Sequence, residues 1–186
     1  MLILEKSLGK GAVRECYEHP ADKTKCVKVL LPHASLSVFE KELKNYSVVK
    51  DVLSDYIVSC EKELVETNKG KGLVCERLLD DDGSPSKMIY EIEPDDDLKR
   101  ELDSFFGLLL THNLFFYDFN EQNFAVQIKN GRKRLKYIDL KSFRHNNSWC
   151  FLKLEGVFDC LARIMMTRRL KRVYKILKLD VPLFIK

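Results

Sequence analysis

An aspartate and an asparagine interrupt an apolar stretch in the second half of the chain. Residues 114–126 read LFFYDFNEQNFAV, so Asp118 and Asn123 stand among aromatic and aliphatic neighbours. A stretch of this kind usually becomes a buried strand or turn, and burying a carboxylate without a partner is costly. A bound cation is one way to offset that cost.

The sequence after Asn123 predicts that a further carboxylate, Asp139, lies at the same place. An Asn-Gly pair at 130–131 separates AVQIK from RKRLKYID, and this is the strongest short-range signal for a two-residue β-hairpin. Such a turn pairs residues whose numbers sum to 261, which places Asn123 opposite Ile138 and beside Asp139. Because Asp118 precedes the open end of the hairpin, all three polar side chains can converge there.

Two carboxylates and a carboxamide oxygen are hard ligands, suited to magnesium that is also bound by water and phosphate. The alternative is that each side chain caps a local turn, as Asp and Asn often do. That alternative explains any one of these residues better than it explains three that converge on one hairpin end.

A complementary set of residues lies near the N-terminus. In LGKGAVRECY, Gly9 and Gly11 stand between two expected strands, where the backbone could pass close to a ligand and turn its N–H groups toward phosphate oxygens. A glycine pair alone more often marks a plain turn. A turn near 19–23 strengthens the phosphate interpretation, because it folds the strand KCVKVLL back so that Lys28 lies across from the region of Arg14.

The side chain of Lys28 is expected on the face of its strand opposite to Val27 and Val29, since successive side chains alternate. A lysine there is either solvated or paired with an anion. The helical segment FEKELKNY offers Glu40 and Glu42 as partners, and the sequence leaves the choice between them open.

The elements that would position these residues form an α+β arrangement. Strand-like segments fill most of residues 1–79, with turn signals at 19–22 and 68–70, and one helix is expected over 37–53 with Ser37 as its N-cap. The acidic, turn-rich residues 80–97 read as a linker whose aspartates are solvated. Residues 98–186 would hold the hairpin and two or three helices.

The order of these parts resembles the protein-kinase fold: a glycine loop, a strand lysine, a helix glutamate, a hinge, a D-x-x-x-x-N loop and a metal aspartate. LGKGAVRECYEHPADKTKCVKVL, FEKELKNY and LLDDDGSPS are also similar to the YrbL-like family of small bacterial proteins, described as part of the PhoP regulatory network. The resemblance implies a small bilobal fold, with an antiparallel N-lobe carrying one helix and a reduced, mainly helical C-lobe.

The resemblance also implies a role for each site residue, with ATP and Mg²⁺ as the ligands. The glycine loop would cover the phosphates, Lys28 would contact them and pair with Glu42, and Asp118 would orient the attacking hydroxyl. The remaining expected contacts are adenine with backbone near Glu76 and Leu78, and magnesium with Asn123 and Asp139.

The chain departs from the kinase pattern at several positions. Arg14 replaces the third loop glycine, Phe116 and Tyr117 replace the His-Arg before Asp118, and D-F-G reads Asp139-Leu140-Lys141. No A-P-E follows, so the platform for a peptide substrate is missing. Three hypotheses remain: a phosphotransferase acting on a small-molecule, lipopolysaccharide-sugar or protein hydroxyl; a pseudokinase or nucleotide sensor that signals through a partner; and a non-kinase interaction domain.

Composition sets further expectations for this chain of 186 residues. Its net charge of +4 is mixed in sign, which argues against a nucleic-acid partner. The six cysteines form no CxxC pair, and we expect them to be reduced, as in a cytoplasmic protein. No apolar run is long enough to cross a bilayer.

The expected C-terminal helix over 161–178 carries a stripe of Met166, Leu170, Val173 and Leu177 with basic residues elsewhere. Such a helix more often packs its stripe on its own domain, although peripheral contact with an anionic membrane is an alternative.

Overall fold

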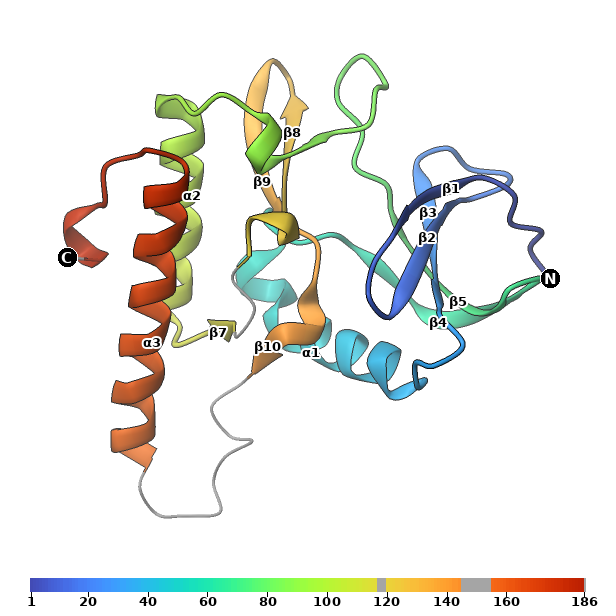
Figure 1. Ribbon diagram of the computed structural model, residues 1–186, viewed down its shortest axis with the longest axis horizontal. Coiled ribbons are helices and arrows are strands. Elements are labelled where there is room, and N and C mark those ends of the chain that lie inside the picture. Colours follow the sequence, from blue (N-terminus) through green and yellow to red (C-terminus); the bar gives the residue numbers. More distant parts are fainter. Residues whose placement is uncertain (117–119, 145–154, 186) are drawn as a thin grey trace.

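A five-stranded antiparallel sheet and one helix form the N-terminal part of the molecule (Figure 1). The structure is a computed structural model that describes residues 1–116, 120–144 and 155–185. The strands lie in the order β1-β2-β3-β5-β4. Their bounds are β1 Ser7–Lys10, β2 Arg14–Glu18, β3 Lys25–Leu30, β4 Cys60–Thr67 and β5 Gly70–Glu76.

The two faces of this sheet bury different residues, because side chains alternate along each strand. Val27 and Val29 of β3 pack on one face with Leu4, Tyr17 and Val74. The opposite face buries Cys26, Leu73 and Cys75 against Phe39. Lys28 therefore emerges on the second face, as the sequence pattern predicted.

Helix α1 (Ser37–Leu53) has the predicted length and buries Phe39, Val49 and Leu53. The expectation that Ser37 caps it is wrong. Leu36 already has helical dihedral angles and occupies the N-cap position without a side-chain bond, so Ser37 lies inside the first turn. The Ser37 backbone N–H instead donates to the hydroxyl of Ser35 at 3.3 Å.

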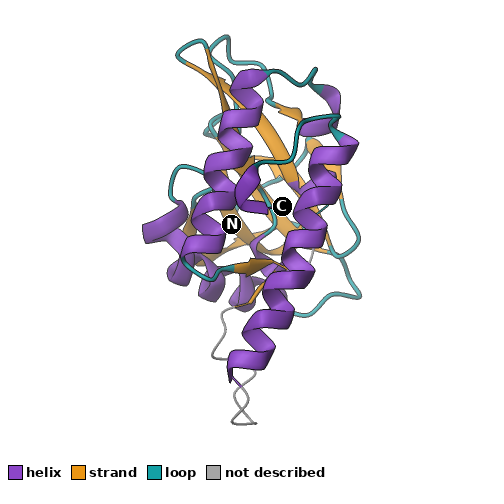
Figure 2. Ribbon diagram, turned by 90° about the vertical axis from the view of Figure 1, so that its left-hand side faces the viewer, coloured by secondary structure: helices purple, strands orange, loops and turns teal. Residues whose placement is uncertain are grey.

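The remainder of the chain combines two long helices with two small sheets. The helices α2 and α3 stand on the near side of Figure 2, with strands behind them. One sheet has the order β6-β8-β9, and β7 pairs with β10 in the other. The bounds are β6 Lys87–Met88, α2 Asp96–Thr111, β7 Phe115–Phe116, β8 Phe124–Lys129, β9 Arg132–Tyr137, β10 Phe143–Arg144 and α3 Glu155–Ile176.

The largest core lies between α2, α3 and the β8–β9 hairpin. The predicted apolar stripe of α3 is buried in it, and its members are Met166, Leu170, Val173 and Leu177. The Tyr174 hydroxyl donates to the carboxylate of Asp103 on α2, and its ring packs against Phe106. None of the described helices combines the length and apolarity that crossing a bilayer requires.

The β8–β9 hairpin has the register predicted from its turn. Phe124 pairs with Tyr137 and Lys129 with Arg132. The two turn residues at 130–131 have φ angles of 51° and 69°, the left-handed values that a type I′ turn requires.

Two aspartates of the acidic linker hold this hairpin in place. Asp81 is exposed, as expected for a solvated linker, whereas Asp80 is partly buried. The Asp80 carboxylate accepts the Ile128 N–H at 2.9 Å, and the Asp81 carboxylate accepts the Gly131 N–H at 2.9 Å. Both bonds satisfy backbone groups at the end of a strand, where a carboxylate is a stronger acceptor than a neutral oxygen.

The expectation that the cysteines are reduced is wrong for Cys60 and Cys75, which form a disulfide between β4 and β5, and right for Cys16 and Cys26, which are free thiols. The β4–β5 register shifts between Cys60 and Leu64, and this irregularity brings Cys60 opposite Cys75. On its other side Cys75 lies opposite Cys26 of β3, which is a free thiol.

Candidate phosphate and metal site

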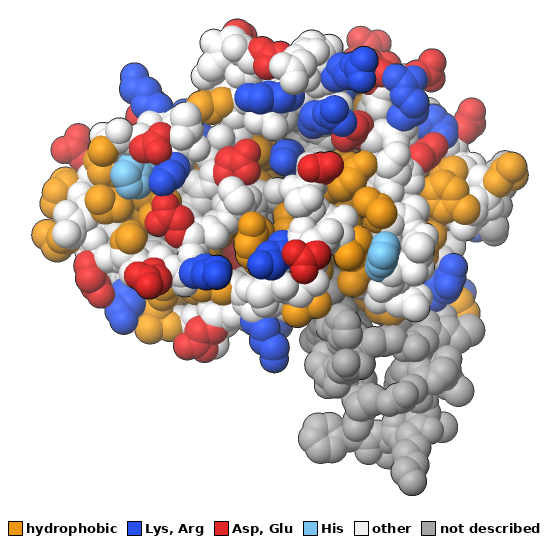
Figure 3. Space-filling model, turned by 180° about the vertical axis from the view of Figure 1, so that it is seen from behind, with side chains coloured by type: hydrophobic (Ala, Val, Ile, Leu, Met, Phe, Trp, Pro, Cys, Tyr) orange, Lys and Arg blue, Asp and Glu red, His pale blue; other side chains and the backbone are white. Residues whose placement is uncertain are grey.

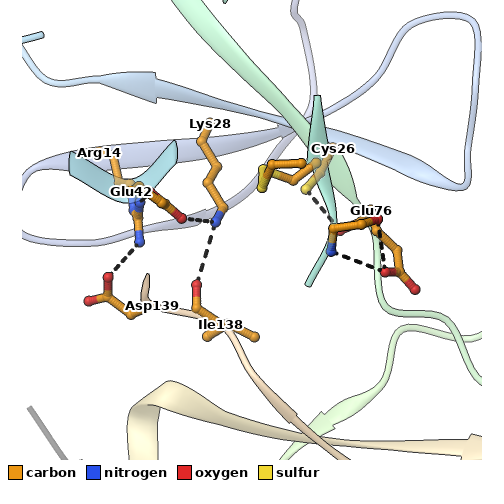
Figure 4. Close-up of a disulfide and its surroundings, with 10 residues drawn as sticks. Arg14, Cys26, Lys28, Glu42, Glu76, Ile138 and Asp139 are labelled. Atoms are coloured by element: carbon orange, nitrogen blue, oxygen red, sulfur yellow. Dashed lines mark hydrogen bonds and ion pairs between the residues drawn. A yellow bond between two sulfur atoms is a disulfide. The ribbon is translucent and has the colours of Figure 1, made fainter. Parts of the chain in front are cut away.

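The face of the sheet that meets α1 holds a buried ion pair. The Lys28 ammonium lies 2.8 Å from Oε1 of Glu42 on α1 (Figure 4). The Lys28 side chain is 11% exposed and that of Glu42 only 2%. This contact selects Glu42 rather than Glu40, whose side chain is exposed, as the glutamate that meets the lysine.

A second cation, Arg14, approaches Glu42 from the start of β2. Its Nη1 donates to Oε2 of Glu42, and its Nη2 lies 3.1 Å from Oδ1 of Asp139. Arg14 lies opposite Leu30, two residues along β2 from the pair formed by Cys16 and Lys28. Both cations therefore extend from the same face of the sheet.

The segment that follows the hairpin places Asp139 against these cations. The Lys28 ammonium lies 3.4 Å from the carbonyl oxygen of Ile138. The carboxylate of Asp139, which is buried, also lies 3.2 Å from the ammonium of Lys141. Residues that are far apart in the sequence thus form one charged cluster, Arg14, Lys28, Glu42, Asp139 and Lys141.

Helix α1 also fixes the backbone after Asp139. Asn45 lies three residues beyond Glu42 and donates through Nδ2 to the carbonyl oxygen of Leu140 at 2.6 Å. Residues three apart on a helix share a face. The same helical face therefore anchors Lys28 through Glu42 and orients the Asp139 segment through Asn45.

The electrostatics of Glu42 reflect both its burial and its partners. Burial alone would raise the pKa of Glu42, because a buried carboxylate loses hydration. The adjacent charges of Lys28 and Arg14, with their hydrogen bonds, outweigh burial and lower that pKa. Glu42 is therefore ionised at neutral pH and holds both cations.

Asn123 ends the short 3-10 helix Glu121–Asn123 at the open end of the hairpin, as predicted. Its carbonyl oxygen accepts the Ile138 N–H at 2.9 Å, so its backbone lies beside the segment that carries Asp139. Asp118, the predicted hydroxyl-orienting residue, lies outside the described residues.

Gly9 and Gly11 lie at the exposed edge of the sheet beside Arg14. Gly9 pairs with Cys16, and the Gly11 N–H donates to the Arg14 carbonyl oxygen at 2.8 Å. A Cβ atom at Gly9 would meet nothing within 4 Å. The space next to the Gly9 backbone is therefore unfilled by the described residues, whereas a Cβ atom at Gly11 would lie 3.6 Å from the Arg14 carbonyl oxygen.

Some backbone groups of the segment expected to contact adenine already form hydrogen bonds within the protein. The Glu76 N–H donates to the Ser59 carbonyl oxygen at 2.8 Å, and the Leu78 carbonyl oxygen accepts the Ser86 N–H at 3.0 Å. Among the described residues the Leu78 N–H has no acceptor, so it can still bind a ligand.

A pocket of about 460 Å³ opens beside Glu76, between β8 and the ends of β3, β4 and β5. The disulfide and several charged side chains line it, but Lys28, Glu42 and Asp139 do not. The charged cluster is therefore separate from this pocket.

Sequence reasoning missed three members of the site: Arg14, Asn45 and Lys141. The sequence indicates Arg14 as a replacement for a glycine and as a neighbour of Lys28 across the strands, but not as a partner of Glu42 and Asp139. Asn45 had a recognisable signal, since it is a polar residue three positions from Glu42 on the buried face of an amphipathic helix. Lys141 had none, because its contact depends on the turn after Asp139.

Within the described residues, no group of three or more histidine, cysteine, aspartate or glutamate side chains is arranged to hold a metal ion. Positive and negative side chains are interspersed on the face seen in Figure 3, without a continuous basic surface there. That face does not have the basic stripe that typically binds nucleic acid.

Comparison with known proteins shows the family. Residues 1–179 match the family described as PhoP regulatory network protein YrbL. Two relatives, both named as the protein YrbL, come from Escherichia coli (strain K12) and Shigella flexneri. Each is 33% identical over 90 residues, which cover 47% of this chain and 43% of the relative. The matched part thus spans less than half of each relative, whereas the family match covers almost the whole chain, and the chain belongs to the PhoP regulatory network protein YrbL family.

Proposed function

We propose that this chain binds ATP with magnesium at the Lys28–Glu42–Asp139 cluster, in a kinase-like arrangement, and transfers the terminal phosphoryl group to a hydroxyl acceptor. The observation that carries the proposal is the buried lysine: Glu42 holds Lys28 at 2.8 Å, and the backbone just before Asp139 lies 3.4 Å from the same ammonium. A lysine fixed next to a metal-binding carboxylate is suited to a metal-bound polyphosphate.

The residues present fit both ligands. The cluster has more cations than carboxylates, with three of the former and two of the latter, so it suits an anion. Asp139 and Asn123 supply hard oxygen ligands, and magnesium usually takes only one or two carboxylates together with phosphate oxygens and water. Bound magnesium would neutralise charge that develops on the phosphate oxygens.

Each residue then has a distinct task. Lys28 contacts phosphate oxygens and is held by Glu42, so it needs no reorganisation when the substrate arrives. Asn45 fixes the Leu140 carbonyl and thereby the direction of Asp139. Asp118 accepts the proton of the attacking hydroxyl, the role that the resemblance assigns to it.

The fold supports a bilobal kinase-like architecture. An antiparallel sheet with one helix stands on one side of the cluster, and the Asp139 segment approaches from the other (Figures 1 and 4). The acceptor stays open among a small molecule, a lipopolysaccharide sugar and a protein.

A second candidate is a nucleotide-sensing module without turnover. It is favoured by the contacts of Asp139, whose carboxylate forms ion pairs with Arg14 and Lys141. Family membership in a regulatory network is compatible with either function.

Two measurements on the purified chain separate the candidates. Isothermal titration with ATP and magnesium should give binding that Lys28→Ala abolishes, while Arg100→Ala, a change at an exposed ion pair on α2, leaves it intact. Phosphotransfer further predicts a magnesium-dependent loss of γ-phosphate that Asp118→Asn removes without removing binding. Binding with no turnover would favour the sensor, and absence of binding would refute both.

A further inference from the structure

Neither the kinase pattern nor the proposed roles explain why Arg14 belongs to the cluster. Its guanidinium bridges two carboxylates from different parts of the fold, Glu42 of α1 and Asp139 after the hairpin. The Arg14 side chain is 14% exposed and those of its partners are 2% and 8%. Because these side chains are largely buried, water and salt screen the attraction between Arg14 and the two carboxylates only weakly.

The Asp139 contact is not needed to satisfy Glu42. Each carboxylate oxygen of Glu42 already has a cation, Lys28 on one and Arg14 on the other. Asp139 is the residue expected to bind the metal, and its Oδ1 is the atom that Arg14 contacts at 3.1 Å. A divalent cation at that oxygen would lie next to the guanidinium, where like charges repel.

Resting on the proposed function, we propose that Arg14 is an internal counter-cation for Asp139, which competes with the divalent metal and sets the metal concentration that the site requires. In the structure Arg14 contacts one carboxylate oxygen of Asp139, and Lys141 contacts the other. When a metal binds, the Nη2 contact to Asp139 breaks and Arg14 keeps its contact with Glu42. Arg14 is thus a positioning residue that acts through Asp139.

The position of Arg14 would also let a bound nucleotide promote the breaking of its contact with Asp139. The Arg14 carbonyl oxygen accepts the Gly11 N–H at 2.8 Å, so the residue forms the base of the glycine loop. A phosphate under that loop would offer the guanidinium an alternative anion, since arginine binds phosphate as readily as carboxylate. Nucleotide would then favour metal entry.

The test measures metal binding directly, without nucleotide, using Mn²⁺ as the probe and electron paramagnetic resonance as the readout. Loss of one charge-assisted hydrogen bond corresponds to about a tenfold change or more. We therefore expect Arg14→Ala and Arg14→Gln to bind Mn²⁺ at least about tenfold more tightly than the unmodified chain. Arg14→Gln is included because it retains a hydrogen-bonding group for Glu42.

Arg77 provides the matched control. It pairs with Glu18 at 2.6 Å, and its side chain is 13% exposed, close to the value for Arg14. Arg77→Ala should leave Mn²⁺ affinity unchanged, and adding Asp139→Asn to Arg14→Gln should remove the gain.

Unchanged or weaker Mn²⁺ binding in a folded Arg14→Gln chain, with folding checked by circular dichroism, would overturn the inference. A gain that persists after Asp139→Asn would overturn it as well. Failure of the proposed function is distinguishable, because the unmodified chain would then show no ATP binding whether or not the Arg14 variants gain affinity for Mn²⁺.

Discussion

Reduction of the Cys60–Cys75 disulfide should lower the free energy of unfolding by an amount that depends on the length of the loop it closes. The two residues are separated by 15 positions. In the chain-entropy description, a closed loop of about 15 residues stabilises the native state by about 3 kcal/mol, because the cross-link restricts the unfolded chain. That is a large fraction of the 5–15 kcal/mol typical of a domain.

The assay is urea unfolding followed by circular dichroism, with and without reductant, on the unmodified chain and on Cys75→Ser. Both perturbations should lower the free energy of unfolding by about 3 kcal/mol. Cys75 is the residue to replace because it lies opposite both Cys60 and Cys26, whereas those two stand on strands that β5 separates. Cys16→Ser, outside the disulfide, is the control.

Cys60→Ser tests the same dependence on loop length with a different pair of cysteines. It leaves Cys75 opposite the thiol of Cys26, 75 − 26 = 49 positions away in the sequence. A disulfide between them would close a longer loop, worth about 4 kcal/mol in the same description. Unfolding midpoints that coincide for the unmodified chain and Cys75→Ser, and that do not respond to reductant, would show that the disulfide does not stabilise the fold.

Two further predictions concern helix α1. Glu42→Gln should destabilise the chain by about 3–5 kcal/mol, because Lys28 and Arg14 lose their buried counter-charge. Since the pKa of Glu42 is lowered in the folded chain, its contribution is present above the unfolded value near 4.5 and is lost as the pH falls through the lower folded value. The stability of the unmodified chain should therefore fall more steeply than that of Glu42→Gln between about pH 5 and pH 3, and parallel curves in acid unfolding would contradict this. Asn45→Ala should lower the free energy of unfolding by about 1–3 kcal/mol, because it leaves the Leu140 carbonyl without its donor. Ser47→Ala, on the exposed face of α1, should change the urea midpoint little. Equal effects of these two changes would show that the bond to Leu140 contributes nothing.

The parts of the fold that follow from local rules could be predicted from the sequence. The turn at 130–131 set the register of β8 and β9, and the alternation of Val27, Lys28 and Val29 set the face on which the lysine emerges. The α1 limits followed from apolar spacing. Each of these depends on a few neighbouring residues.

The parts that depend on long-range geometry could not be predicted. The choice between Glu40 and Glu42 requires the rotation of α1 about its axis against the sheet. The disulfide depends on the register shift in β4, since continuing the pairing of Thr67 with Gly70 would have placed Cys60 opposite Arg77. The Arg14–Asp139 contact joins residues 125 positions apart, and no local pattern indicates it.

The proposed binding of a magnesium–nucleotide between Lys28 and Asp139 should be detectable in a melting curve. A ligand present at a hundred times its dissociation constant stabilises the native state by about 2.7 kcal/mol. For a chain of this length, that corresponds to a rise in Tm of roughly 5–10 °C. We expect a rise of this size with ATP and magnesium together, a smaller rise without magnesium, and none in Lys28→Ala or Asp139→Asn. Equal melting temperatures in the unmodified chain with and without magnesium and ATP would contradict the proposed binding.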